Sequence, residues 1–245
     1  MEFKSKEELE FYLNNSKELG SGSQGTAYYD AKNNQVIKVF HDFYDDDFDS
    51  TRFKKEDVLR FKEIVNNTYI FPTDVLTLNN SVIGYLSKYV TGASLYSINP
   101  LNIKLDNMIK AIEPVFKATK KITRDFVATY DVMYNIMYNN TNFYIIDTDE
   151  YSYSDKCYDE LLRDNQNNFD ISIKYFLVDC IFDELVESNK ILYEMYKTKE
   201  CNSLEFLKEL RKVLSEYNGS KIDKLCQVEK YTNKTKRMHK LVRYV

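Results

Sequence analysis

The sequence has few of the residues that bind transition metals or interrupt secondary structure. Its 245 residues include two histidines, six glycines, three prolines and no tryptophan, and its four cysteines form no C-x-x-C pair. A structural zinc site or a histidine-based nucleophile is therefore poorly supported. No run of about 18 apolar residues is present, and the opening residues MEFKSKEELE lack an apolar segment. We therefore expect a cytoplasmic protein with reduced thiols and no membrane partner.

The residues that are present are typical of a folded protein. Hydrophobic residues make up 43% and charged residues 29%, which is enough for a substantial core. A net charge of −4 argues against nucleic acid as a partner. The charge is uneven, with an acidic run over 42–49 and a basic end over 234–243, and most runs of this kind are solvated faces.

The hydrophobic pattern predicts an α+β fold in two lobes. Residues 1–91 contain a predicted antiparallel sheet and one helix, and residues 92–245 are mostly helical. Strands are predicted over 17–19, 27–30, 35–40, 75–78 and 82–90, with the helix over 51–65. In the second lobe a β-hairpin over 135–147 interrupts the helices. Pro114 is expected to open a helix, Ser203 to cap one that ends at Gly219, and Asp170 to lie at a helix start.

Three of the six glycines, Gly20, Gly22 and Gly25, lie within six residues. This G-x-G-x-x-G segment lies between two predicted strands, because the turn at Asn33-Asn34 comes too early for a helix. The dinucleotide fingerprint requires a helix at this place, so a Rossmann-type site is excluded. In a hairpin, glycines let the backbone approach phosphate groups and direct amides at them. A glycine turn without a ligand is the alternative.

Lys38 follows in the β-branched run Gln35-Val-Ile-Lys-Val-Phe40. A lysine on a half-buried strand needs an anionic partner. The glycine loop and this strand together resemble the Gly-rich loop and V-A-I-K strand of protein kinases. On these motifs the sequence is identified as protein-kinase-like, similar to small prokaryotic or phage-type Ser/Thr-kinase-like proteins. The resemblance implies ATP and Mg²⁺ as cofactors, with the phosphates held by Gly20, Gly22, Gly25 and Lys38.

The resemblance also implies a helix that supplies a carboxylate to Lys38. We assign this role to Glu56 in the segment Phe53-Lys-Lys-Glu-Asp-Val-Leu59. Asp57 and Glu63 are the competing candidates, and an exposed helical glutamate without this role is the alternative.

The segment from Gly84 to Gly92, GYLSKYVTG, resembles the kinase hinge. By this match Ser87 is the gatekeeper, and the Lys88 carbonyl and the Val90 amide bind adenine. Because both contacts use the backbone, the identity of these side chains gives little evidence for adenine binding. An ordinary edge strand is the alternative.

The segment from Tyr130 to Asp149 resembles the kinase run from the catalytic-loop aspartate to the metal-binding aspartate. The resemblance implies that Asp131 positions the acceptor hydroxyl and that Asn135 and Asp147 bind Mg²⁺. Oxygen ligands of this kind suit a metal ion held on phosphates.

Three features depart from the protein-kinase pattern. Asp131 lies four residues before Asn135 instead of five, so a strict alignment places Tyr130 at the base position. No His-Arg pair precedes Asp131, and Arg124-Asp125 lies too far upstream. Asp147-Thr-Asp149 replaces D-F-G and is similar to the I-D-x-D/E of aminoglycoside- and choline-kinase-like enzymes.

The segment between Asp147 and Asp170 is too short for a long, phosphorylation-switched activation loop. The leading hypothesis is a kinase that transfers the γ-phosphoryl group of ATP to a hydroxyl acceptor, with protein Ser/Thr favoured slightly over small molecules. A pseudokinase that binds nucleotide without transfer is one alternative, and a small-molecule kinase of the aminoglycoside or choline-kinase type is the other.

Overall fold

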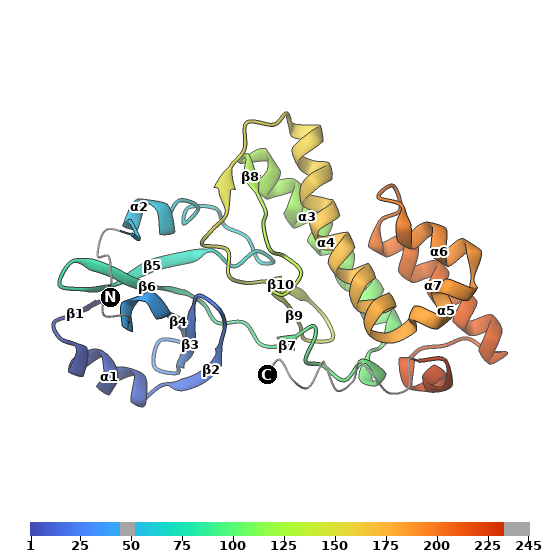
Figure 1. Ribbon diagram of the computed structural model, residues 1–245, viewed down its shortest axis with the longest axis horizontal. Helices are drawn as coiled ribbons and strands as arrows, with labels where there is room; N and C mark the ends of the chain where they lie inside the picture. Colours follow the sequence, from blue (N-terminus) through green and yellow to red (C-terminus); the bar gives the residue numbers. More distant parts are fainter. Residues whose placement is uncertain (45–51, 233–245) are drawn as a thin grey trace. The chain divides into compact units, whose positions relative to one another are not determined.

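The computed structural model describes residues 1–44 and 52–232 (Figure 1). Most of the acidic run, from Asp45 to Asp49, and the basic end over 234–243 lie outside these residues. The chain divides into two compact units. Unit 1 comprises Met1–Thr91 and the separate segment Asp147–Glu150. Unit 2 comprises Gly92–Ile146 and the described residues from Tyr151 onward.

Unit 1 is built on a six-stranded sheet with the order β1-β5-β6-β4-β3-β2. Its strands are β1 (Glu2–Phe3), β2 (Lys17–Ser21), β3 (Gly25–Asp30), β4 (Gln35–Phe40), β5 (Pro72–Leu78) and β6 (Ser81–Lys88). The pairing is antiparallel except between β1 and β5. The predicted strands are thus confirmed. Asn79 and Asn80 both have positive φ in the β5–β6 turn, which is the geometry that a tight hairpin requires.

Unit 1 also contains a helix that the sequence analysis did not predict, α1 (Lys6–Asn14). The Ser5 hydroxyl accepts a hydrogen bond from the Glu8 amide, while the Glu8 carboxylate accepts one from Lys4 N. This reciprocal arrangement resembles a capping box. Leu9 and Leu13, four residues apart, pack into the core of the sheet with Phe3, Ile37, Leu76 and Ile83.

The helix predicted over 51–65 is much shorter in the structure, where α2 spans Lys55–Val58 and residue 51 is outside the described part. Beyond α2 the backbone forms i→i−3 turns, such as Ile64 N to Phe61 O. The Asn66 side chain then accepts hydrogen bonds from Thr68 N and Tyr69 N. An asparagine that bonds the following amides in this way forms a turn, so the helical stretch cannot continue past Asn66.

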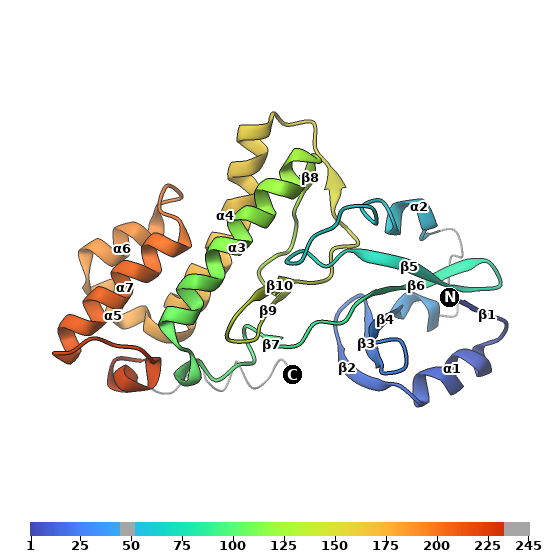
Figure 2. The same ribbon diagram turned by 180° about the vertical axis from the view of Figure 1, so that it is seen from behind.

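Unit 2 is mostly helical. Its helices are α3 (Leu105–Arg124), α4 (Tyr158–Leu177), α5 (Asp183–Ser188), α6 (Lys190–Lys197) and α7 (Ser203–Asn218). A π-helical turn (Val178–Phe182) joins α4 to α5, and two 3-10 segments span Pro100–Asn102 and Leu225–Tyr231. Figures 1 and 2 show α3 and α4 packed side by side. No helix of the described chain is long and apolar enough to cross a membrane.

Two small sheets complete unit 2. One has the order β10-β9-β7 and the other pairs β11 with β8. Their strands are β7 (Ala93–Ser94), β8 (Val127–Ala128), β9 (Ile136–Tyr138), β10 (Phe143–Ile145) and β11 (Ser152–Tyr153). The β9–β10 pair is the hairpin predicted over 135–147.

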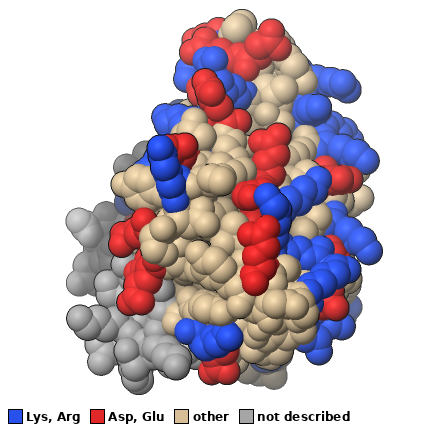
Figure 3. Space-filling model, turned by 90° about the vertical axis from the view of Figure 1, so that its right-hand side faces the viewer, with Lys and Arg blue, Asp and Glu red and all other residues tan. Residues whose placement is uncertain are grey.

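The prediction that Pro114 opens a helix is wrong, because Pro114 lies inside α3. Buried side chains such as Met108, Ile112 and Val115 continue past it on one face, while Pro114 itself is exposed. This burial outweighs the loss of one helical hydrogen bond. The exposed face of α3 is basic, with Lys110, Lys117, Lys120, Lys121 and Arg124. Figure 3 shows Lys and Arg gathered along its right-hand edge, on the side of unit 2 where α3 lies.

The helix start predicted at Asp170 is also wrong, because α4 begins at Tyr158 and includes Asp170. The Asp170 carboxylate instead accepts a hydrogen bond of 2.8 Å from Ser203 N, in the first turn of α7. The N-cap of α7 is Asn202, one residue before the predicted Ser203. Gly219, at φ 70°, ends this helix as predicted.

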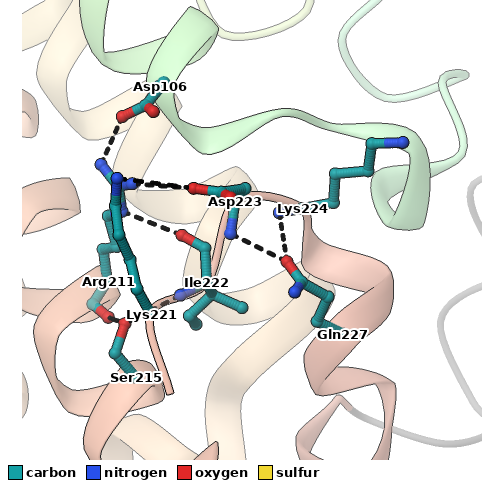
Figure 4. Close-up of polar contacts among 8 residues, drawn as sticks. All are labelled: Asp106, Arg211, Ser215, Lys221, Ile222, Asp223, Lys224 and Gln227. Atoms are coloured by element: carbon teal, nitrogen blue, oxygen red, sulfur yellow. Dashed lines mark hydrogen bonds and ion pairs between the residues drawn. The ribbon is translucent and has the colours of Figure 1, made fainter.

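Arg211 of α7 connects the last described segment of the chain to α3 (Figure 4). Its guanidinium pairs with Asp106 and Asp223 and donates a 3.0 Å hydrogen bond to the Ile222 carbonyl. Gln227 fixes the same turn, because its side-chain oxygen accepts from Asp223 N and Lys224 N at 2.8 Å. These contacts stabilise unit 2 without forming a reactive site.

Candidate functional site

Lys38 lies at the centre of unit 1. Strand β4 places it opposite Ala27 of β3 and Tyr85 of β6, and only 8% of its surface is exposed. Its ammonium group forms an ion pair with Asp147 and lies 3.7 Å from Asp149 Oδ1. The anionic partner that the sequence analysis required therefore comes from Asp147–Glu150, the short segment that belongs to unit 1.

Two further contacts within unit 1 fix this segment. The Tyr85 hydroxyl donates to Asp147 Oδ1 at 2.9 Å, and the Thr148 hydroxyl donates to the Ile70 carbonyl at 2.9 Å. Asp147 has a φ of 60°, which is rare for a residue other than glycine. Backbone strain of this kind is often found at functional positions, since the surrounding structure must hold it in place.

The two carboxyl groups are in different electrostatic states. Burial raises the pKa of Asp147, but the Lys38 charge and the hydrogen bonds from Lys38 and Tyr85 lower it to below the ordinary value. In Asp149 the effect of burial prevails and, with the charge of Asp147, raises the pKa to about 6. Burial and the two carboxylates also raise the pKa of Tyr85, so its hydroxyl remains a donor. Unit 1 thus holds one firmly ionised carboxylate and one that titrates closer to neutral pH.

The glycine-rich loop connects β2 to β3. A Cβ at Gly25 would collide with the Val39 carbonyl, so packing against β4 explains this glycine. A Cβ at Gly20 or Gly22 would meet nothing within 4 Å. Packing therefore gives no reason for these two glycines, and the space beside them would let a ligand approach the backbone.

Both polar atoms of the Gln24 side-chain amide, at the tip of the loop, form hydrogen bonds. Its oxygen accepts a 3.1 Å hydrogen bond from the Lys38 ammonium group, and its nitrogen donates to Glu150 Oε1 at 2.5 Å. The loop is thereby connected to the lysine and to the acidic segment.

The expected pairing of Lys38 with Glu56 is not found among the described contacts. Glu56 is exposed on α2, and the charge of Lys38 is already matched by Asp147 and Asp149. The competing candidates are not partners of Lys38 either, because Asp57 pairs with Arg60 and Glu63 is exposed. The role of Glu56 stays a prediction.

The hinge segment follows β6, which ends at Lys88. Ser87 and Val90 are buried, while Lys88 is exposed. In the part of the chain that the structure describes, no hydrogen bond from the Val90 amide is found. The adenine contacts assigned to Lys88 and Val90 stay predictions.

In unit 2 a hydrogen bond joins Asp131 and Asn135. The Asn135 side-chain nitrogen donates to the Asp131 carbonyl at 3.0 Å, which leaves the side-chain oxygen as a possible metal ligand. The Asn135 carbonyl accepts from Ile146 N at 2.9 Å, and Ile146 directly precedes Asp147. Asp131 is exposed and, at φ 43°, is a second strained residue.

The donor atoms of the chain decide which metal ion it could hold. Among residues 1–44 and 52–232 no group of three or more His, Cys, Asp or Glu could hold a metal ion by itself. Asp149 Oδ1 is buried and accepts no hydrogen bond, so it is an available hard ligand beside Asp147. Mg²⁺ commonly takes one or two carboxylates and completes its shell with water and substrate phosphates. The residues therefore fit this ion better than one that needs a full protein cage.

A separate hollow of about 220 Å³ lies in unit 2, lined by Ile98, Asn99, Asn102, Ile103, Tyr138 and Asn140. No charged side chain lines it, so it offers nothing to balance a phosphate. The charged cluster around Lys38 is the stronger candidate.

Four residues of this cluster were not predicted from the sequence: Gln24, Tyr85, Thr148 and Glu150. Gln24 lies between the loop glycines Gly22 and Gly25, which is a weak local signal. The contact from Tyr85 to Asp147 joins residues 62 apart in sequence, so no local pattern could indicate it.

A sheet unit with a glycine loop and a buried lysine, together with a helical unit, defines a protein-kinase-like fold. Two solved structures of the Mycobacterium tuberculosis PknI kinase domain, one of them a mutant, are similar to the chain. Each is 13% identical and covers 80% of this chain and 93% of its own. The TM-score is 0.49 for the first and 0.51 for the mutant, and the fold assignment rests on the latter. No protein-family model and no curated protein matches the sequence.

Proposed function

We propose that this protein is an ATP- and Mg²⁺-dependent phosphotransferase that transfers the γ-phosphoryl group to a hydroxyl acceptor. One observation carries the proposal: a buried lysine and two carboxylates lie together in unit 1, and Gln24 connects the glycine-rich loop to them. The space beside Gly20 and Gly22 in this loop contains no other atoms of the described chain within 4 Å of a Cβ position. Phosphoryl transfer needs cationic donors on the phosphates and oxygen ligands for the metal ion, and this cluster contains both.

In this proposal each residue has a defined task. Lys38 binds the α- and β-phosphates, and the backbone at Gly20 and Gly22 lies close to them. Asp147 and Asn135 bind the metal ion, which neutralises charge on the phosphates when present. Glu56 orients Lys38 once phosphates replace the carboxylates as its partners. Lys88 and Val90 bind the adenine through their backbone.

Asp131 is the residue that positions the acceptor hydroxyl. It is exposed, and its backbone is held by the Asn135 amide. Tyr130, the alternative in a strict alignment, has its hydroxyl 3.1 Å from that of Ser152. A phenol is also a weak proton acceptor compared with a carboxylate near neutral pH. Protein serine or threonine is the first acceptor class to test.

Thermal unfolding with and without Mg²⁺-ATP tests the nucleotide claim. A ligand at about 100 times its Kd stabilises the folded state by roughly 2.7 kcal/mol, so the Tm should rise. Lys38→Ala should lose most of this rise, while Lys32→Ala in the exposed β3–β4 turn should keep it. No rise with any nucleotide in the wild type would contradict the proposal.

A nucleotide-binding protein without transfer activity is the second candidate, because Asp131 lies four residues before Asn135. Labelled ATP separates the two functions. Transfer to the protein itself or to an extract, lost in Asp131→Ala, supports the kinase, whereas binding without any transfer or hydrolysis supports the pseudokinase. Labelling of small hydroxylated molecules alone would favour the third class, which the Asp147-Thr-Asp149 motif resembles.

A further inference from the structure

The Gln24 side chain connects the glycine-rich loop to Lys38 and to Glu150. It accepts from Lys38 at 3.1 Å and donates to Glu150 at 2.5 Å. Its neighbour Ser23 is exposed and forms no hydrogen bond in the described chain. The Gln24 carbonyl also accepts from His41 N at 2.9 Å, and Ser21 Oγ lies 3.1 Å from His41 Nε2, so these contacts hold the base of the loop. The Gln24 side chain connects the tip to Lys38 and Glu150, and its bond to Lys38 uses the ammonium group that the proposed function assigns to the phosphates.

The contact to Lys38 is not needed to balance its charge. Asp147 and Asp149 already supply the opposite charge, and a neutral amide adds only a hydrogen bond. The Gln24 contact to Glu150 has the opposite polarity, because there the amide nitrogen meets a carboxylate. The neutral Gln24 amide thus bridges the Lys38 cation and the Glu150 anion, and it holds the loop against both without adding charge to the site.

We propose that Gln24 is a latch that closes the glycine-rich loop in the nucleotide-free protein and that phosphate groups must displace. This inference rests on the proposed function, because the phosphates compete with the Gln24 oxygen for Lys38. Glu150 is the second half of the latch. A nucleotide that enters exchanges the Gln24–Lys38 bond for a phosphate–Lys38 bond, and the loop must release Glu150 to receive it.

The proposal predicts that removing the latch tightens nucleotide binding. Gln24→Ala changes no charge, so it isolates the hydrogen bonds from the electrostatic field of the site. The net contribution of one or two hydrogen bonds corresponds to a Kd about three- to tenfold lower. Gln24→Asn should behave in the same way, because its side chain is one methylene shorter and cannot span both partners. Ser23→Ala is the matched control and should bind like the wild type.

Calorimetry with Mg²⁺ and a non-hydrolysable ATP analogue measures this change. If Gln24 only stabilised the fold of the loop, the Gln24 variants should bind nucleotide more weakly. Tighter binding therefore distinguishes a latch from a purely structural role. An unchanged or higher Kd in both Gln24 variants would overturn the latch.

Amide hydrogen exchange without nucleotide tests loop closure independently. The amides over 20–25 should exchange several-fold faster in Gln24→Ala and in Glu150→Ala than in the wild type, and the double variant should add little more. Equal exchange in wild type and Gln24→Ala would also overturn the proposal. If the exchange result holds but no protein binds nucleotide, the proposed function and the competition for Lys38 both fail, while closure of the loop by Gln24 stands.

Discussion

Replacing Asp149 by asparagine should make the nucleotide-free protein more stable at neutral pH. The Asp149 side chain is 8% exposed, and its pKa is raised to about 6. A raised carboxyl pKa means that the folded state binds the proton more tightly than the unfolded state does. The corresponding stability is fully present below the unfolded pKa and is lost as the pH rises through about 6.

The size of this effect follows from the shift. The Asp149 pKa of about 6 lies some two units above the ordinary value for aspartate, which corresponds to roughly 3 kcal/mol in the free energy of unfolding. Asparagine keeps the shape and carries no charge, so Asp149→Asn should regain about this amount at pH 7.5. At pH 4 the wild-type carboxyl is largely protonated, and the two proteins should differ little.

Urea unfolding at both pH values, without nucleotide or Mg²⁺, measures the prediction. Asp147→Asn is the matched control, since the pKa of Asp147 is lowered and its charge is paired with Lys38. That variant should be less stable at pH 7.5, with the difference fading as the pH falls below the ordinary range of aspartate. If Asp149→Asn is destabilised at pH 7.5, or its gain is the same at pH 4, the reasoning about its burial is wrong.

Two further changes test the site and the helical unit. Asp147→Asn should weaken Mg²⁺-dependent nucleotide binding or turnover more than Asp149→Asn does, because Asp147 is ionised and lies just after strand β10. Titrations with Mg²⁺ measure this order, and the reverse order would place the main metal ligand two residues later. Arg211→Ala should cost about 1–3 kcal/mol in urea unfolding, since it removes the hydrogen bond to the Ile222 carbonyl and the ion pairs with Asp106 and Asp223. Lys212→Ala on the exposed face should cost under about 0.5 kcal/mol, and equal losses would mean that the Arg211 contacts contribute little.

The parts of the fold that the sequence predicted depend on local patterns. Strands β3 and β4 lie on either side of the Asn33-Asn34 turn, and β4 is rich in β-branched residues. Strands β5 and β6 flank Asn79-Asn80, whose positive φ values suit a tight turn. The errors came where two local signals compete. Pro114 indicates a helix start by itself, but the apolar stripe of α3 continues through it. Helix α1 was missed although Ser5 and Glu8 lie at capping-box spacing.

The candidate site was predictable only in its local half. The glycine loop and Lys38 follow from residue types and spacing, because both depend on strands that are adjacent in sequence. The partner of Lys38 does not, since Asp147 lies 109 residues away and the choice between Asp147 and Glu56 depends on tertiary packing. The resemblance to kinases indicated a carboxylate from a helix, whereas the structure places Asp147 and Asp149 beside Lys38.

The placement of this acidic segment has an energetic consequence for the site. Two carboxylates beside one lysine leave unit 1 with an excess negative charge in a buried position, and the raised pKa of Asp149 expresses that cost. A neutral residue of the same shape at position 149 should be more stable there. A divalent cation on the phosphates would remove the repulsion, and Lys38 would then be released to a phosphate oxygen. The excess negative charge of the cluster thus favours a cationic ligand, and the stability of Asp149→Asn relative to the wild type measures the cost of that charge.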